Sequence, residues 1–242
     1  MFGGYVRLLS VERLKMAKSP VWLLALVSPA IAVLIGLLAN PGGNWQVLLS
    51  AMLTVHALLF MPMLTAVFAS LVCRFEHGGG GWKQLMSLPL SRTSLYAAKL
   101  TIIMALVGLT QLLFGGALLG VGAVQDMNGP IPWAVIAQSL LAGWVACLPL
   151  AALQLMVSFL WSSFAAPLAL NFVFTVPNIL VANSQTYGPY YPWTQPLLAM
   201  MPSGRDNFGA FMVPTDTLLT VIMGSFVVFT VAGLTVFRYK EI

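Results

Sequence analysis

Side chains that could carry acid–base, metal or redox chemistry are sparse in this sequence. The six acidic residues are scattered singly, at Glu12, Glu76, Asp126, Asp206, Asp216 and Glu241. Cys73 and Cys147 stand far apart, without the spacing of a zinc site or a disulfide framework. General acid–base catalysis needs positioned titratable groups, and a metal centre needs clustered ligands. We therefore predict neither a catalytic site nor a metal site.

A run of four glycines, Gly78–Gly81, precedes Trp82 and Lys83 and invites comparison with a phosphate-binding loop. Such a loop needs Gly-Lys followed by Ser or Thr. Here the lysine follows tryptophan and precedes glutamine. We expect no nucleotide hydrolysis by this chain and no cofactor bound directly to it.

The residues that follow the glycines are typical of a short docking helix. Trp82, Leu85 and Met86 share one helical face at spacing i, i+3 and i+4. Leu88-Pro89 then ends the helix. A short amphipathic helix suits a groove on a partner protein. The alternative is a helix that rests on lipid headgroups.

A second polar set lies within apolar segments of the sequence. Its members are His56, Gln111, Gln138, Gln154, Asn171 and Asn178. Hydrogen bonding between membrane helices is the ordinary role of such residues. The alternative is that they line a substrate path. No Lys, Arg, Asp or Glu lies near the middle of these segments, which argues against a proton-coupled or sodium-coupled carrier.

The composition indicates what positions these residues. Of the 242 residues 60% are apolar and only 7% are charged, and the mean hydropathy is +0.93. A soluble domain carries about a quarter charged residues, so lipid must surround most of this chain. We predict an all-α integral membrane fold in a single domain, 1–242, with six transmembrane spans. Turn signals place them at 20–39, 46–73, 95–124, 133–159, 164–183 and 215–237.

The basic residues predict the orientation. All of them except Arg205 lie before the first span, between the second and third spans, or after the last. Because basic residues are retained on the cytoplasmic side, we expect both termini and the loop 74–94 in the cytoplasm. Charges grouped at helix ends do not form a nucleic-acid footprint, so no nucleic-acid partner is expected.

Two segments outside the spans have predicted roles. Residues 1–19 place Phe2, Tyr5, Val6 and Leu9 on one apolar stripe, which predicts a helix at the membrane surface. A simple basic tail is the alternative. The extracytoplasmic loop 184–214 contains the short apolar run Leu197–Met201, which favours a re-entrant element. Ordinary interfacial anchoring by its aromatic residues is the alternative. In addition, prolines inside spans are expected to bend them.

One stretch resembles a known family. Glu76 is followed by the sequence from Trp82 to Leu100, which reads Trp-Lys-Gln-Leu-Met-Ser-Leu-Pro-Leu-Ser-Arg-Thr-Ser-Leu-Tyr-Ala-Ala-Lys-Leu. It is similar to the permease subunits of ABC-2 type transporters, and in particular to the lantibiotic-protection (immunity) permeases. The expected topology matches theirs over nearly the whole chain. The run of four glycines departs from their pattern and puts the docking geometry in doubt.

The resemblance implies partners and a function. Such permeases pair with a second copy or a sister permease and with two cytoplasmic ABC ATPase subunits, which bind ATP and Mg. It implies an exporter of an amphipathic peptide, antibiotic or lipid-like substrate in the bacterial cytoplasmic membrane. An ATP-independent carrier or channel is the alternative, and a membrane-embedded enzyme is a third. The residues implied to couple the permease to the ATPase are Glu76, Trp82, Lys83, Leu85, Met86, Leu88, Pro89 and Arg92.

Overall fold

The protein is represented by a computed structural model that describes residues 2–17, 19–77, 81–86, 91–201 and 213–239, with side chains omitted for 2–4 and 84–86. All regular elements in these ranges are helices, which confirms the predicted all-α class. In chain order they are α1 (Phe2–Ala17), α2 (Val21–Leu38), α3 (Trp45–Val55), the π-helical turn η1 (His56–Phe60), α4 (Met61–His77), α5 (Gly81–Met86), α6 (Arg92–Val124), α7 (Trp133–Ala146), α8 (Leu148–Leu160), α9 (Ala165–Thr175), α10 (Asn178–Ala182), α11 (Gln195–Met200) and α12 (Thr215–Tyr239).

Five stretches of the described chain are long and apolar enough to cross a membrane. They are Val21–Leu38, Trp45–His77, Arg92–Val124, Trp133–Leu160 and Thr215–Tyr239. Each begins and ends within a few residues of an expected span. The expected span at 164–183 is instead two helices, α9 and α10, separated at Val176 and Pro177. Proline has no amide hydrogen to continue a helix, and the 11 residues of α9 cover only about 16 Å, less than a bilayer core.

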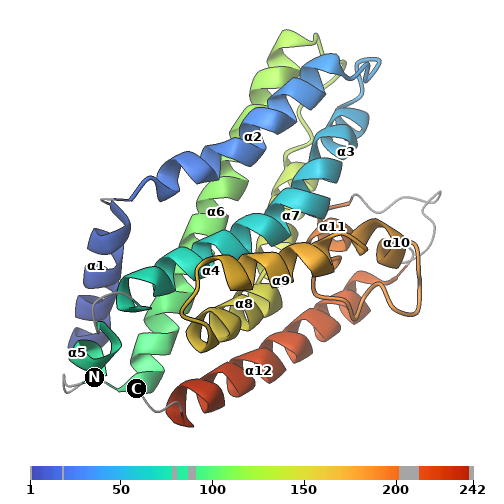
Figure 1. Ribbon diagram of the computed structural model, residues 1–242. Helices are drawn as coiled ribbons and strands as arrows, with labels where there is room; N and C mark the ends of the chain where they lie inside the picture. Colours follow the sequence, from blue (N-terminus) through green and yellow to red (C-terminus); the bar gives the residue numbers. More distant parts are fainter. Residues whose placement is uncertain (1, 18, 78–80, 87–90, 202–212, 240–242) are drawn as a thin grey trace.

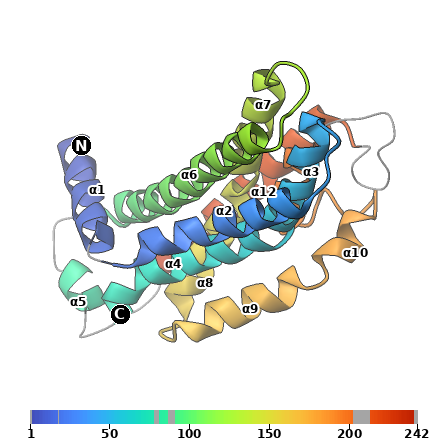
Figure 2. The ribbon, with the colours of Figure 1, turned by 90° about the horizontal axis from the view of Figure 1, so that it is seen from above.

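The long helices form a bundle with α5 at one end. Figure 1 places the two ends of the chain at the end of the bundle where α1 and α5 lie. Seen from above, α6 runs along one flank and α9 and α10 run along the other, with α2 and α4 between them (Figure 2). The most extensive contacts between helices are those of α8 with α12, α2 with α6, and α4 with α8.

The helix from Trp45 to His77 contains a π turn just before Pro62. Proline at this position leaves the Leu58 carbonyl without its usual intrahelical donor. The Asn178 side-chain amide of α10 donates to that carbonyl at 2.7 Å. The Asn171 amide of α9 likewise donates to the Pro62 carbonyl at 3.2 Å. The carbonyl that Pro62 leaves without a donor is thus satisfied by a side chain of a neighbouring helix, as membrane burial requires.

The buried face of α1 differs from the predicted stripe. Val6 is 55% exposed, whereas Leu8, Glu12 and Met16 are 5%, 1% and 1% exposed. This face packs mainly on α6. The predicted stripe was assigned to the membrane surface and not to the bundle. The structure adds a second face of α1, which contacts the bundle through Leu8, Glu12 and Met16.

The segment before α12 folds back into the bundle. Gln195, Pro196 and Leu197 are buried at the start of α11, which packs mainly on α7 and also contacts η1, α3 and α12. The Ser139 hydroxyl of α7 donates to the Met200 carbonyl at 2.6 Å. This short buried helix occupies the place where the sequence indicated a re-entrant element.

Gly116 and Gly120 have the small-xxx-small spacing that is common where membrane helices approach closely. The close helix contacts in this structure are at other glycines. A Cβ added at Gly116 or Gly120 would meet nothing within 4 Å. A Cβ at Gly122 would lie 2.3 Å from the Trp45 ring, and that ring is only 9% exposed. Gly122 is therefore the position where α6 admits the large side chain of α3.

Alanine substitution at these glycines should separate packing from helix propensity. We expect Gly122→Ala to destabilise the protein by about 1–3 kcal/mol, because the buried Trp45 ring must move. Gly120→Ala should be neutral or stabilising by up to about 1 kcal/mol, because alanine favours a helix. Thermal unfolding in detergent compares the two variants. Equal midpoints would contradict the assigned packing.

Candidate functional site

α5 begins against the last turn of α4. A Cβ added to Gly81 would lie 2.9 Å from the Cα of Glu76 and 3.0 Å from the Phe75 carbonyl oxygen. Real Cβ atoms essentially never show a contact as short as the first of these, and the second is tighter than most. Glycine at position 81 therefore allows α5 to lie directly on α4, which places the next residue, Trp82, over the bundle.

Trp82 is buried by side chains from three spanning helices. Its side chain is 7% exposed, and its ring centroid lies 5.6 Å from that of His77 on α4, 5.4 Å from that of Phe159 on α8 and 5.7 Å from that of Phe237 on α12. Phe159 and Phe237 stack on each other at 4.5 Å. A single aromatic side chain of α5 thus touches the ends of α4, α8 and α12.

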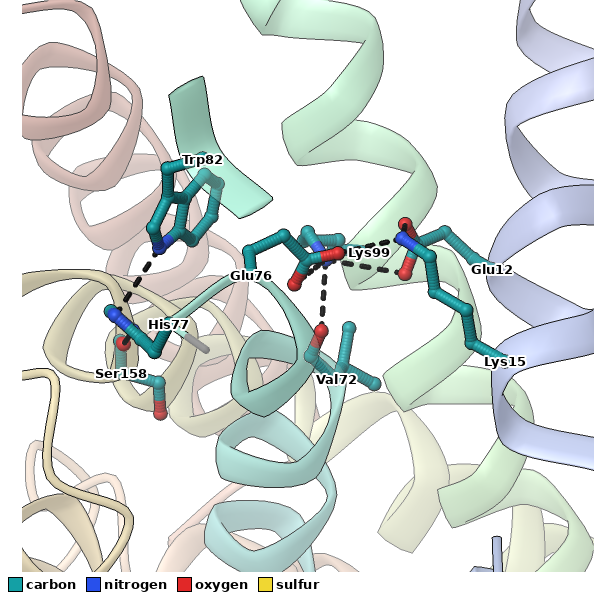
Figure 3. Close-up of polar contacts among 8 residues, drawn as sticks. All are labelled: Glu12, Lys15, Val72, Glu76, His77, Trp82, Lys99 and Ser158. Atoms are coloured by element: carbon teal, nitrogen blue, oxygen red, sulfur yellow. Dashed lines mark hydrogen bonds and ion pairs between the residues drawn. The ribbon is translucent and has the colours of Figure 1, made fainter. Parts of the chain in front are cut away.

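Hydrogen bonds fix the Trp82 ring. The indole Nε1 donates to Nδ1 of His77 at 3.2 Å, and Nε2 of His77 lies 2.7 Å from the Ser158 carbonyl oxygen. Because an indole N–H can only donate and a carbonyl can only accept, Nδ1 accepts and Nε2 donates. The His77 imidazole thus links α5 to α8 through α4 (Figure 3).

Beside Trp82 lies a buried cluster of charges, which we call the Lys99 cluster: Glu12, Lys15, Glu76 and Lys99. Nζ of Lys99 lies 3.2 Å from Oε2 of Glu12 and 2.9 Å from Oε2 of Glu76. It also donates to the Val72 carbonyl at 2.8 Å. Lys15 bridges the two carboxylates at 2.8 and 2.6 Å (Figure 3). The cluster joins α1, α4 and α6.

The Lys99 cluster is balanced in charge and nearly dry. Lys99, Glu12 and Glu76 are 0%, 1% and 4% exposed, and Lys15 is 24% exposed. An isolated buried ammonium is too costly to remain charged in an apolar environment. Here the three donors of the Lys99 ammonium face three oxygens, and two carboxylates offset two ammonium groups. Each charge therefore depends on the others being in place.

The start of α6 presents Lys99 and Arg92 to these contacts. Ser91 caps the helix, because its hydroxyl oxygen accepts from the Ser94 amide at 3.1 Å. Arg92 donates to the Phe237 carbonyl at 3.2 Å and also to the Arg238 carbonyl. A basic side chain is favourable at a helix C-terminus, where carbonyls have no intrahelical donor. Arg92 thus joins the beginning of α6 to the end of α12.

The residues implied for ATPase coupling have different surroundings. Glu76 belongs to the Lys99 cluster, Trp82 is turned into the bundle, and Arg92 binds the end of α12. Lys83 is exposed on α5. The side chains of Leu85 and Met86 and the whole of Leu88 and Pro89 lie outside the described residues. Among the implied residues whose side chains the structure describes, Lys83 is the one on α5 that faces solvent.

Most of the polar residues expected within the spans are buried, and their side chains form hydrogen bonds. His56 lies between the hydroxyl of Ser28 at 2.6 Å and Oε1 of Gln111 at 3.3 Å, and its ring stacks on Phe114 at 4.1 Å. Gln111 also donates to the Met200 sulfur at 3.3 Å. These contacts join α2, η1, α6 and α11.

A separate network lies around Asn171. Its Oδ1 accepts from Nε2 of Gln154 and from Nε1 of Trp193, both at 2.8 Å. Asn178 donates to the Trp193 carbonyl at 2.8 Å. Gln138 is exposed on α7 and belongs to neither network. The structure therefore divides the expected path residues between two buried networks and one outward-facing position.

Sequence reasoning missed several residues of this site. Glu12, Lys15 and Lys99 were read as topogenic or isolated charges, and His77, Phe159 and Phe237 were not singled out. One sequence feature could have indicated the cluster. Lys99 is a charge on an otherwise apolar face of its helix, and the opposite charges Glu12 and Glu76 lie near the ends of other helices. Among the described residues, no group of three or more His, Cys, Asp or Glu side chains could hold a metal ion.

Removing the central charge should destabilise the fold. Lys99→Met leaves Glu12 and Glu76 buried with only Lys15 to offset them, and breaking a buried pair from one side costs about 3–5 kcal/mol. We expect a lower unfolding midpoint in detergent, partly restored when Glu12→Gln is added. Lys83→Met is the matched control at an exposed lysine and should change the midpoint little. A Lys99→Met protein as stable as the Lys83→Met control would contradict the role of the cluster.

Comparison with known proteins identifies the family. The family model described as ABC-2 family transporter protein matches residues 8–178, which is more than half of the 242-residue chain. No curated protein sequence matches the chain. The matched range contains the Lys99 cluster, α5 and all of the Asn171 network except Trp193. The chain therefore belongs to the ABC-2 transporter family, as a membrane-spanning permease subunit that works with an ABC ATPase subunit.

Proposed function

We propose that this permease couples ATP hydrolysis by two cytoplasmic ATPase subunits to the export of an amphipathic peptide, antibiotic or lipid-like substrate. A second permease copy or a sister permease completes the membrane part of the complex. ATP and Mg act in the ATPase subunits. In this proposal the chain lies in the bacterial cytoplasmic membrane with both termini in the cytoplasm.

The observation that carries the proposal is the position of Trp82. It extends from α5, a helix of six residues that is too short to span a membrane, and it contacts His77, Phe159 and Phe237 on three separate helices. A force applied to α5 would reach α4, α8 and α12 through one rigid ring. We assign Trp82 to transmission and the exposed side of α5, which carries Lys83, to contact with the ATPase.

The Lys99 cluster supports the same role. It fixes the end of α4, on which α5 rests, to α1 and α6. Ion pairs and hydrogen bonds from three helices restrain these side chains, although Oε2 of Glu76 is held by its ion pair with Lys99 alone. Movement of α5 would therefore move the ends of α1, α4 and α6 together, and would not be absorbed by local deformation of α4.

The orientation follows from charge. Arg13 and Lys83 lie on α1 and α5, Arg74 lies in the last turn of α4, and Arg92 is the first residue of α6. α1 and α5 are at the end of the bundle where both chain ends are found (Figure 1). Basic residues are enriched on the cytoplasmic side of membrane proteins. This end is therefore assigned to the cytoplasm, where ATPase subunits bind.

The export of an amphipathic substrate is proposed from two features. The stretch from Glu76 to Leu100 resembles permeases that remove antimicrobial peptides from the membrane. At the opposite end, α11 is buried among α7, α3, η1 and α12. A short buried helix of this kind suits a closure on the outer side that opens for a substrate leaving the bilayer.

Purification of the tagged chain from its native membrane in mild detergent tests the proposal. We expect a soluble subunit with Walker A and Walker B motifs to copurify, together with a second permease. Recovery of the chain alone under several mild conditions would favour the ATP-independent carrier. In that case His56→Ala would be expected to abolish transport.

Two substitutions on α5 should separate transmission from binding. Burial of an aromatic ring stabilises by about 1.5–3 kcal/mol, and a difference of about 1.4 kcal/mol corresponds to a tenfold change in an equilibrium constant. Trp82→Ala should therefore reduce ATP-dependent transport in proteoliposomes by about tenfold or more, while the ATPase still copurifies. Lys83→Glu should instead weaken copurification. Trp82→Ala with normal transport would contradict the transmission role.

A further inference from the structure

A pocket of about 280 Å³ opens where the end of α4 meets the turn between α8 and α9. Its wall includes Arg74, Ser158, Ser162, Ser163, Trp161 and Phe164. This volume is at the lower limit of small-molecule sites, so it suits a compact headgroup better than a drug-sized ligand. None of the residues that line it is acidic.

The charge in this pocket is not neutralised within the described chain. Arg74 is exposed and makes no hydrogen bond or ion pair with any described residue. Its guanidinium lies over the Phe164 ring at 5.7 Å from the centroid. By contrast, Lys15 and Lys99 are both paired with carboxylates. A planar guanidinium whose edges are free is suited to bidentate binding of a phosphate.

Hydroxyl groups and aromatic rings complete the surroundings. Ser162 and Ser163 are exposed in the turn, so their hydroxyls can donate to phosphate oxygens beside Arg74. Trp161 and Phe164 are 44% and 38% exposed. Aromatic side chains of this kind mark the level of lipid headgroups, and basic pockets between membrane helices at that level hold anionic headgroups.

The adjoining surface suits acyl chains. α9 leads away from the pocket and exposes Phe172, Val173 and Val176 by 52%, 64% and 63% of their surface, the last of them just past its end. A soluble anion would gain nothing from this apolar surface, whereas a phospholipid would bury it. We propose that the pocket at Arg74 binds the phosphate group of an anionic phospholipid whose chains lie along α9.

The site also adjoins the transmission element. His77 lines the pocket and accepts the hydrogen bond from Trp82, and Ser158 contributes both to the pocket and to the His77 contact. An occupied pocket would therefore hold the last turn of α4 beside α5. The binding itself does not depend on the proposed transport function.

Native mass spectrometry of the purified chain tests the site. The detergent-solubilised protein is titrated with phosphatidylglycerol, phosphatidylcholine or inorganic phosphate. We expect phosphatidylglycerol to remain bound at collision energies that remove phosphatidylcholine. Arg74→Gln should weaken phosphatidylglycerol binding by about tenfold or more, because a hydrogen bond to a charged group is lost. Arg13→Gln, at an exposed arginine on α1, is the matched control and should bind as the wild type does.

Several outcomes would overturn the proposal. They are equal binding of phosphatidylcholine, unchanged phosphatidylglycerol binding by Arg74→Gln, and competition by inorganic phosphate, which would indicate a site for a soluble anion. If Arg74→Gln fails to fold, Ser163→Trp fills the pocket from an exposed turn and should reduce phosphatidylglycerol binding similarly. Normal binding by a folded Ser163→Trp protein would also overturn the assignment.

Discussion

The buried ammonium of Lys99 is the interaction on which the α5 end of the bundle depends. It has no exposed surface, and it is surrounded by Glu12 of α1, Glu76 of α4 and the Val72 carbonyl. A charge in this position is stable only when its partners are present. The ends of α1, α4 and α6 therefore form one unit, and α5 rests on that unit through the close approach at Gly81.

The rest of the bundle is organised by the helix that ends in this cluster. The helix from Trp45 to His77 contains a π turn and Pro62. Asn178 of α10 donates to the Leu58 carbonyl, which Pro62 leaves without its usual donor, and Asn171 of α9 donates to the Pro62 carbonyl. The buried Asn171 network then links α9 to α8 and to the segment before α11. Polar groups at membrane depth thus specify which helices are neighbours. Apolar packing alone specifies the neighbours only weakly.

The sequence allowed prediction of the class and of most spans, because runs of apolar residues and turn signals are local properties. The span at 164–183 was predicted as one continuous helix. A proline such as Pro177 can either bend a helix or end it, and which of the two occurs depends on the residues packed around it. The Lys99 cluster was beyond local reasoning. Its charges lie 61 and 87 residues apart along the chain, and each one alone is typical of a cytoplasmic helix end.

The partners of α5 could be predicted only in part. The spacing of Trp82 indicated an amphipathic helix but could not specify that the ring faces the chain itself, because this depends on Phe159 and Phe237 from distant helices. Family membership confirms the permease and its need for an ATPase. In the function proposed above, the route between the two runs through the aromatic packing around Trp82 and the balanced charges of the Lys99 cluster.

The most direct test of this account measures the distance between α5 and α1 during turnover. Spin labels at positions 83 and 13, both exposed, are introduced after the buried Cys73 and Cys147 are replaced by alanine. Because Lys83 is assigned to contact with the ATPase, copurification of the ATPase with the labelled protein is verified first. Pulsed electron paramagnetic resonance is then recorded on the complex without nucleotide and with trapped ATP. The account predicts the same narrow distance distribution in both states, because the Lys99 cluster moves as one unit with α5. A distance that shifts or broadens with nucleotide would show that α5 moves independently, which would contradict the central claim.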